Sequence, residues 1–476
     1  MAVNIWTASD LDAVFGSDSV GRTPEERAQT SKRQFVRGSI QIAVSNPRAN
    51  GRRLSAKETL DAFGSDILYD IREHGFTPII IKEGEPGRTI SARRKAMSLS
   101  VDELSNRIGI SAEDFMNFEQ GKAILPYRDI EKICRSLVLD EAVIGYRSGS
   151  GGDPQLGVRF KEFVDGSGEV SQMSGGMVIH LAEASWVVRK QLALQAKLGV
   201  SQREVLQRLD IKPNSDYQYP SYAKGYALAA RTRDALGLAE LETIESLTNL
   251  IEDKLCIPVV SSEFSRLLAG ATVSPVDDGR GILLNVTGHN SNVWVRRVTL
   301  AHELGHLLWD PASQLNGLVV DEYEALSRTG NVVVDFDEVE ARANAFAAEF
   351  LAPRKGVELI FKKHNKIADG VRAVMEHYGV SFSTARWQLV NARLIKSDDN
   401  IPNVDSEHTE EWSIREEAYL GFFPISTVPS SRRGKFFSVI MESLSKGLIS
   451  DDTAAFCLEC SLADFLENKK ELIGLA

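Results

Sequence analysis

The sequence predicts a multidomain, mainly α-helical chain that contains one small α+β domain. Apolar residues recur at three- and four-residue steps in many segments, which is the period of an amphipathic helix. Runs rich in β-branched residues are few and short, at 75–82, 257–261 and 282–286. A chain of 476 residues with 43% hydrophobic content can form two to four domains. The Gly/Ser-rich stretch 148–154 and the acidic stretch 398–411 are predicted linkers.

Composition and charge exclude several classes of protein. The formal net charge is −11, and phosphate repels a protein of that sign, so any binding to nucleic acid must be local. No window comes near the roughly 18 apolar residues of a membrane span, and the start lacks a signal-peptide pattern. We therefore expect a cytoplasmic protein with no membrane partner. Four cysteines are too few for a disulfide framework. The Cys457-Leu-Glu-Cys460 pair can in principle bind metal or cycle its redox state, but buried structural thiols are predicted.

The segment 299–310, TLAHELGHLLWD, has the strongest pattern for chemistry. On a helix, His302 and His306 project from one face about one turn apart, so both imidazoles can reach a single metal ion. Glu303 follows the first histidine, where a carboxylate can take a proton from a metal-bound water as that water attacks a carbonyl. The alternative is two histidines on an ordinary amphipathic helix. The pattern favours a zinc-ligand pair with Glu303 as general base.

Zinc that catalyses hydrolysis keeps three protein ligands and one open position, so a third ligand is needed downstream. Segment 335–353 is a predicted helix, and Glu340 lies on its apolar face. A charged carboxylate is unexpected on such a face unless it has a function. We therefore predict Glu340 as the third ligand, with Asp337, one turn earlier, as the competing candidate. A first-turn carboxylate favoured only by the helix dipole is the non-functional alternative. The flank of this helix is predicted to be solvated and carries Glu338, Arg342 and Glu349.

Two patterns in this region resemble those of the ImmA/IrrE metallopeptidases, which are small zincins. They are Val298-Thr-Leu-Ala-His-Glu-Leu-Gly-His306 and Glu340-x-x-Ala-Asn344-x-Phe346-Ala-Ala-x-Phe-Leu-x-Pro353. The resemblance covers roughly residues 222–396 and implies one Zn²⁺ per chain, bound by His302, His306 and Glu340, with Glu303 as catalytic base. It also implies that the substrate is a regulatory protein, typically a helix-turn-helix repressor.

Residues 88–145 resemble a helix-turn-helix domain of the XRE type. Four short helices are predicted, with Ser100 capping the second and a tight turn before the third. The third helix would read the major groove, but its outward residues include Glu113 and Asp114, whereas phosphate contacts need cations. The alternative is a protein-docking or dimerisation module. The candidate DNA-binding residues are Arg93, Arg94, Lys95, Arg107, Asn117 and Lys122.

The region between the ligand helices also has features that bear on a substrate. The strand predicted at 282–286 is our candidate edge strand, which would bind substrate backbone as an added strand. His289 follows it and is either an oxyanion contact or an ordinary solvated histidine. The loop 311–336 would favour a basic substrate segment, unless its acidic residues are merely solvated. These acidic residues are Asp321, Glu322, Glu324 and Asp335.

The flanking regions are predicted to be mostly helical. Thr23–Ser45 is a predicted helix. Residues 177–209 are a predicted helical spacer, with a second DNA-binding module that uses Gln202 and Arg203 as the alternative. Further helices are predicted in 371–395 and 433–472.

Together these patterns predict six segments and one main function. The segments are a region of unreadable role at 1–87, an XRE-type helix-turn-helix at 88–145, a helical spacer at 146–221, a zincin-like metallopeptidase domain at 222–355, a helical appendage at 356–397 and a C-terminal helical region at 398–476. The predicted function is a zinc-dependent site-specific endopeptidase that cleaves a repressor or antitoxin-like partner, with its own module for DNA or for that partner. The alternative is a DNA-binding transcriptional regulator that uses the zincin fold for sensing, with little proteolysis.

Overall fold

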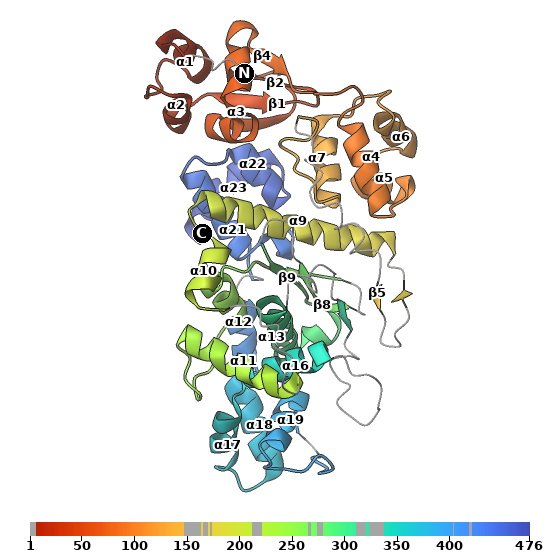
Figure 1. The fold of residues 1–476 in the computed structure, drawn as a ribbon, viewed down its shortest axis with the longest axis vertical. Coiled ribbons are helices and arrows are strands. Elements are labelled where there is room, and N and C mark those ends of the chain that lie inside the picture. Colours follow the sequence, from red (N-terminus) through yellow and green to blue (C-terminus); the bar gives the residue numbers. More distant parts are fainter. Residues whose placement is uncertain are drawn as a thin grey trace. The chain divides into compact units, whose positions relative to one another are not determined.

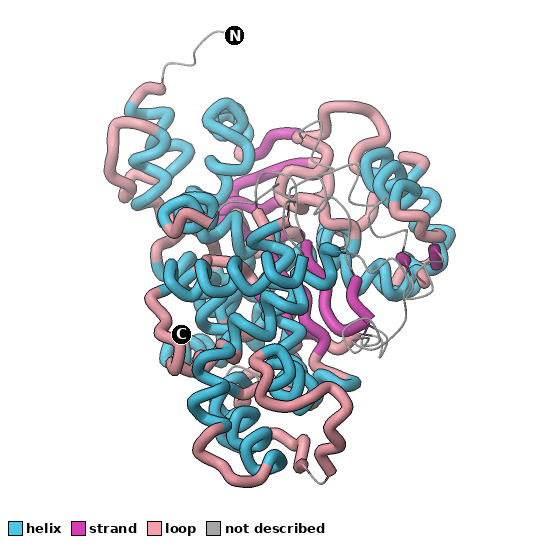
Figure 2. The backbone as a smooth tube through the Cα atoms, turned by 60° about the horizontal axis from the view of Figure 1, so that its bottom comes forward, coloured by secondary structure: helices cyan, strands magenta, loops and turns pink. Residues whose placement is uncertain are grey.

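The computed structural model describes residues 6–146, 163–164, 170–171, 174–211, 221–264, 268–273, 279–310, 320–322, 338–402, 404–417 and 421–476. By its internal contacts the chain forms two compact units. Unit 1 consists of Met1–Lys161, Met173–Gly199 and Phe423–Ala476, and unit 2 of Glu162–Gln172 and Val200–Phe422. Most of the described chain is helical, and its strands form two four-stranded sheets and one two-stranded pair (Figure 1 and Figure 2). This confirms a mainly α chain with small sheets.

The N-terminal part of unit 1 contains a small antiparallel sheet of order β3-β1-β2-β4. Its strands are β1 (Gln34–Arg37), β2 (Gln41–Val44), β3 (Arg52–Ser55) and β4 (Phe76–Pro78). Helix α3 (Ala56–His74) packs on this sheet, and α1 (Ala8–Phe15) and α2 (Pro24–Thr30) pack on α3. The predicted helix over Thr23–Ser45 is therefore wrong beyond Thr30. Cross-strand packing overrides the helical pattern there, because Phe35 lies opposite Val44 on one side and Leu54 on the other.

Four short helices follow, at the positions that the sequence predicts. They are α4 (Gly87–Ala96), α5 (Val101–Ile108), α6 (Ala112–Glu119) and α7 (Tyr127–Ser136). Ser100 and Glu103 form a capping box at the start of α5, and Gly109 ends it with a φ of 82°. The helix pattern is confirmed, while the assignment of a helix-turn-helix domain stays a prediction.

A long helix and three C-terminal helices complete unit 1. They are α9 (Gly175–Lys197), α21 (Lys435–Ser445), α22 (Asp451–Leu458) and α23 (Leu462–Leu475), with the short η4 (Ser430–Arg432) before α21. The C-terminal region that the sequence predicts to be helical is therefore helical. It packs on α9 and on β3, so segments from both ends of the chain share this unit.

Buried charges join the parts of unit 1. Arg52 of β3 forms ion pairs with Glu131 of α7 and, at 3.4 Å, with Glu141. Lys190 of α9 lies 2.7 Å from the same Glu141 carboxylate. Burial alone would raise the pKa of Glu141, but the attraction of Lys190 and Arg52 outweighs burial and lowers that pKa to about 2. The Glu141 carboxylate is therefore ionised at neutral pH. Its ion pairs with Arg52 and Lys190 hold β3 and α9 together, although these elements are far apart in the sequence.

The CxxC pair lies at the end of α22. Cys457 is fully buried and Cys460 is partly exposed. Burial raises the pKa of both thiols, that of Cys460 to about 11. Neither forms a disulfide, and neither belongs to a group of described residues that could hold a metal ion. These features fit the predicted structural thiols.

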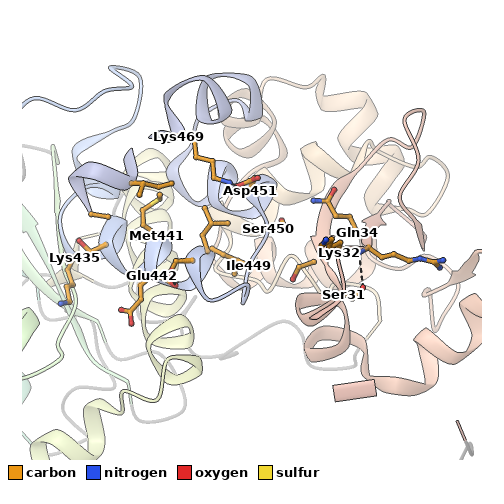
Figure 3. Close-up of a pocket in the computed structure, with 17 residues that line it drawn as sticks. Ser31, Lys32, Gln34, Lys435, Met441, Glu442, Ile449, Ser450, Asp451 and Lys469 are labelled. Carbon is orange, nitrogen blue, oxygen red and sulfur yellow. Dashed lines mark hydrogen bonds and ion pairs between the residues drawn. The ribbon is translucent and has the colours of Figure 1, made fainter. Parts of the chain in front are cut away.

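A cavity of about 900 Å³ in unit 1 is lined by the segment before β1 and by the C-terminal helices (Figure 3). Its lining combines the apolar side chains of Met441 and Ile449 with charged ones such as Lys32. Lys469, another charged residue of the lining, forms an ion pair with Asp451, with 2.5 Å between Nζ and Oδ1. Among the described residues no group that could hold a metal ion lines this cavity, and the group that could hold one, His302, His306 and Glu340, belongs to unit 2.

The sheet of unit 2 has the order β10-β8-β9-β7. Its strands are β7 (Val259–Ser262), β8 (Leu268–Val273), β9 (Gly281–Asn285) and β10 (Val320–Glu322). Strands β7 and β9 are parallel, and the other pairs are antiparallel. The prediction of 282–286 as an edge strand is wrong, because β9 pairs on both sides and all five of its residues are buried.

Helix α13 packs on this sheet, and two further helices pack behind it (Figure 1). Helix α13 (Val293–Trp309) contacts β8, β9 and α16 (Glu338–Leu351), and α11 (Ser221–Leu236) packs on α16. The backbones of α11 and α16 nearly touch, since a Cβ added at Gly225 would lie 2.3 Å from the carbonyl oxygen of Arg342. The smaller elements of unit 2 are β5 (Phe163–Val164), β6 (Val170–Ser171), α10 (Gln202–Arg208), α12 (Leu247–Asn249), η1 (Leu250–Lys254), η2 (Gly288–Ser291), α17 (Arg354–Phe361), α18 (Ile367–Tyr378), α19 (Phe382–Asn391) and α20 (Glu410–Glu417).

Arg297 anchors α13 to segments that precede and follow the sheet of unit 2. Its buried guanidinium forms an ion pair with Glu416 of α20 and donates to the carbonyl oxygens of Gly379 at 3.0 Å and Ile244 at 2.6 Å. Glu416 also accepts a hydrogen bond from the amide of Leu247 at 2.7 Å. Residues beyond the predicted metallopeptidase segment therefore help to hold the helix that carries the histidines.

The spacer segment shows why the second DNA-binding module is not supported. Gln202, at the start of α10, is buried and donates to the carbonyl oxygens of Cys256 at 3.0 Å and Arg280 at 2.8 Å. It also accepts from the amide of Arg280 at 2.9 Å. The side chain is thus used inside unit 2 and is not presented to a ligand.

The described helices include none with the length and apolar composition that a membrane span requires.

Candidate metal centre

Helix α13 carries the two predicted histidine ligands and is buried over most of its surface. It begins after Asn292, whose side chain accepts a hydrogen bond from the amide of Trp294 at 3.0 Å. His302 and His306 are both fully buried. Gly305 lies between them, and a Cβ there would lie 2.9 Å from a ring carbon of Phe346. Helix α16 can therefore approach α13 this closely only because residue 305 has no side chain.

The structure brings His302, His306 and Glu340 together. The two Nε2 atoms lie 2.9 Å apart. Glu340 Oε2 lies 3.3 Å from the Nε2 of His302, and its Oε1 lies 3.4 Å from the Nε2 of His306. Within the part of the chain that the structure describes, no other group of three or more His, Cys, Asp or Glu residues could hold a metal ion. The competing candidate, Asp337, lies outside the described residues.

The environment of Glu340 favours the charged form that a metal ligand needs. Burial alone would raise the pKa of this carboxyl group. Hydrogen bonds and charge interactions with His302 and His306 outweigh burial and hold the pKa of Glu340 well below its usual range. The group is therefore a carboxylate at neutral pH.

Outer contacts of the two histidines decide which ring nitrogens face the centre. His302 Nδ1 lies 2.9 Å from Asn344 Oδ1, and His306 Nδ1 lies 2.8 Å from Asp310 Oδ2. An oxygen acceptor at Nδ1 keeps the ring proton there and leaves a lone pair on Nε2. Both Nε2 atoms and the Glu340 carboxylate then face one another, and positive charge is needed between them, either from protons on Nε2 that are donated to Glu340 or from a metal ion that replaces those protons. Two imidazoles and one carboxylate also match the ligand set of a hydrolytic zinc site, so the residues fit a zinc ion.

Arg342 completes these outer contacts. Its guanidinium forms an ion pair with Asp310, the residue that accepts from His306. The prediction of a solvated Arg342 is wrong, because the side chain is buried against this carboxylate. Helix α16 thus supplies the third ligand Glu340, the outer contact of His302 through Asn344, and the Arg342 guanidinium that holds Asp310, the outer contact of His306.

Glu303, the predicted general base, is fully buried beside strand β8. A Cβ added at Gly270 would lie 2.7 Å from Glu303 Oε1 and 3.0 Å from its Cγ. The carboxylate therefore occupies space that any other residue at position 270 would fill. Asn290 fixes the helix against the sheet, since it donates to the carbonyl oxygens of Ala269 and Asn285, each at 2.9 Å, and accepts from the Thr299 hydroxyl at 3.0 Å.

Comparison with known protein families addresses the same region. Residues 279–389 match the IrrE N-terminal-like domain. This is a family of zinc metallopeptidases, so the match supports a metallopeptidase-like domain of the ImmA/IrrE type. The matched span includes α13 and α16 and extends into α19, but it covers less than half of the chain. No curated protein matches the sequence.

The predicted DNA-contact residues lie in unit 1 and are used in different ways. Arg93 and Arg94 are buried, with Arg93 donating to the carbonyl oxygen of Leu137 at 2.9 Å and Arg94 making two 2.8 Å bonds to Glu119. Arg107 forms a two-point contact with Glu183 of α9, at 3.0 and 2.5 Å. These three guanidinium groups are thus engaged inside the unit.

The remaining DNA-contact residues differ in their exposure. Lys95 and Lys122 are exposed and Asn117 is half-buried. Three cations of the predicted set, Lys95, Arg107 and Lys122, are therefore exposed, although Arg107 is paired with Glu183, and DNA binding stays a prediction.

Several residues of the centre do not belong to the motifs that the sequence predicts. Asp310 lies four residues after His306, and Asn344 lies four residues after Glu340, so helical spacing could have pointed to both. No spacing pattern in the sequence points to Gly270. Exposed His289 lies in η2, outside the group of metal-binding residues. The acidic loop mostly lies outside the described residues: Glu324 and Asp335 are not described, and only the backbone is described for Asp321 and Glu322.

Proposed function

We propose that this chain is a zinc-dependent endopeptidase that cleaves a regulatory protein. The observation that carries the proposal is the convergence of His302, His306 and Glu340, with their outer contacts already in place, beside the buried carboxylate of Glu303. The match of this region to a peptidase family supports the same chemistry. Three protein ligands leave a fourth position for water, which a structural zinc site lacks.

The chain's own groups have distinct parts in the proposed reaction. A bound zinc ion would polarise the scissile carbonyl and acidify a water molecule. His302, His306 and Glu340 hold the ion, and Glu303 accepts the proton of the attacking water and returns it to the leaving amine. The buried setting of Glu303 keeps bulk water away from this proton transfer.

The proposed substrate is a DNA-binding repressor or an antitoxin-like regulator. This proposal rests on the resemblance to the ImmA/IrrE group and on the attached four-helix module. In this proposal, residues 88–145 hold the enzyme near DNA or near its protein partner. Because Arg94 is buried against Glu119, the informative DNA-binding variant is the exposed pair Lys95→Ala with Lys122→Ala. Loss of promoter binding in a gel-shift assay with unchanged unfolding temperature is the result expected if the module binds DNA.

The test of the enzyme proposal compares Glu303→Gln with wild type and with Glu358→Gln, a control on the exposed side of α17. Zinc content is measured by atomic emission, and cleavage is followed by mass spectrometry on a repressor that co-purifies with the Glu303→Gln variant. We expect unchanged zinc, loss of cleavage only in Glu303→Gln, and one defined cut site. Cleavage at the wild-type rate in Glu303→Gln, or metal-replete wild type without zinc, overturns the proposal.

A further inference from the structure

Strand β8 lies against Glu303, next to the candidate metal centre. Gly270 of β8 is the residue whose missing side chain makes room for Glu303. On one side β8 pairs with β9, where Gly270 lies opposite Leu284. On its other side β8 pairs with β10, where Gly270 lies opposite Asp321. The backbone next to the general base is therefore paired on both sides by strands of the same chain.

An extended peptide binds to a sheet by pairing its backbone with an edge strand. The two edges of this sheet are β7 and β10. β7 is separated from β8 by β9, so a peptide added there would lie far from Gly270 and Glu303. The position that places an added strand nearest to Glu303 is the one beside β8, and residues 320–322 hold that position.

We propose that β10 is a built-in competitor that occupies the substrate's place beside β8 and must leave before a substrate strand can pair there. This inference rests on the proposed peptidase function and adds its regulation. β10 lies in the connection between α13, which ends at Trp309, and α16, which begins at Glu338. Both helices carry metal-binding residues, so the competing strand is tethered at both ends to the centre that it blocks, and its effective concentration there is high.

The pairing of β10 is short enough to be displaced. It has three residues, and its register shifts between Asp321 and Glu322. Strands usually have about five or six residues, and a register shift disrupts the ladder locally. A partner protein that offers a longer strand makes more backbone hydrogen bonds with β8 and replaces β10. Apparent substrate affinity is then the intrinsic affinity reduced by the fraction of molecules in which the edge is open.

A disulfide between β10 and β8 tests the proposal. Ala271 lies opposite Val320, and directly opposed residues of antiparallel strands have Cα separations that a disulfide can span. The double variant Ala271→Cys with Val320→Cys is prepared oxidised and reduced and loaded with zinc. Two probes are titrated by calorimetry: a tripeptide hydroxamate, which needs both the metal and the open edge, and acetohydroxamate, which needs the metal alone.

We expect oxidation to weaken binding of the tripeptide hydroxamate at least tenfold and reduction to restore it. Binding of acetohydroxamate should be unchanged. The single variants, treated in the same way, should show no redox effect. Equal tripeptide binding in both forms, or failure of the two cysteines to form a disulfide, overturns the proposal of a self-blocking strand. Absence of acetohydroxamate binding in both forms and in wild type instead overturns the zinc site, so the two failures are distinguishable.

A second variant approaches the same point without a cross-link. Replacing residues 320–322 by three glycines weakens strand pairing, because glycine costs conformational entropy in a strand. We expect the tripeptide hydroxamate to bind about tenfold more tightly than to wild type, with acetohydroxamate unchanged. Tripeptide binding that weakens in this variant means that β10 helps to bind the peptide, and the proposal is then wrong.

Discussion

Replacing Gly270 by alanine is the sharpest test of how the fold positions Glu303. The added Cβ would lie 2.7 Å from Glu303 Oε1 and 3.1 Å from its Cδ, whereas ordinary contacts begin at 3.4 Å. Relief of the shortest contact needs a shift of about 0.7 Å in the carboxylate, which is fully buried. Since a misplacement of about 1 Å at a reacting group can cost about 100-fold in rate, we expect kcat to fall by roughly 10- to 100-fold.

The stability of the same variant separates positioning from damage to the fold. Gly270 lies in an extended strand, and alanine is favoured over glycine in a strand interior by about 0.5 to 1 kcal/mol. A local clash offsets this gain, so we expect the unfolding temperature to stay within a few degrees of wild type. Zinc content is expected to be unchanged, because the three atoms nearest to the added Cβ all belong to Glu303 and none to a predicted ligand.

A double-variant cycle gives the refuting result. In a Glu303→Asp background the side chain is one methylene shorter, so the added Cβ at residue 270 has more room. The Gly270→Ala substitution should then cost at least fivefold less in kcat than it costs in wild type. If the two losses multiply independently, or if Gly270→Ala removes zinc, the contact with Glu303 is not the reason that residue 270 is glycine.

Three further predictions concern other parts of the fold. Asn344→Ala should weaken zinc binding about 10- to 100-fold in competition with a chelator, because the outer contact to a histidine ligand is lost, while Asn344→Asp should retain most of the affinity. Glu416→Gln leaves buried Arg297 without its carboxylate and should cost about 3 to 5 kcal/mol in urea denaturation, whereas Glu411→Gln, which removes an exposed carboxylate paired with Arg415, should cost about 1 kcal/mol or less. Because neighbouring cations outweigh burial and lower the pKa of Glu141 from 4.5 to about 2, its ionised form contributes stability above pH 4.5 that is lost as pH falls toward 2. This shift corresponds to about 3 kcal/mol, so the advantage of wild type over Glu141→Gln in urea should vanish across that pH interval.

The metal centre follows from the sequence more directly than the fold around it does. Histidines four apart and a carboxylate on an apolar helix face are local patterns, so the residue order alone points to His302, His306 and Glu340. Strand order is not a local pattern. β9 has the composition of a strand, but nothing in its residues shows that it lies between two neighbours. β8 was missed because its sequence, LAGATV, is rich in small residues and contains Gly270.

Charged residues show the same limit. A sequence cannot tell a solvated arginine from one that a distant carboxylate draws into the interior. Arg94 is paired with Glu119, and Arg342 is paired with Asp310. Both partners are more than 20 positions away in the sequence, so helical periodicity alone assigns such arginines to the surface.

The close backbone contact at Gly225 has a consequence for how the candidate metal centre could be disrupted. Helix α16 is seated on α11 through this contact and carries one inner and two outer groups of the metal centre. A slide of α16 along α11 would therefore move all three groups together. Substitution of Gly225 by a larger residue is therefore expected to displace α16 and to disrupt the entire centre. Gly225 is more than 100 positions from Glu340 in the sequence and is not one of the predicted metal ligands.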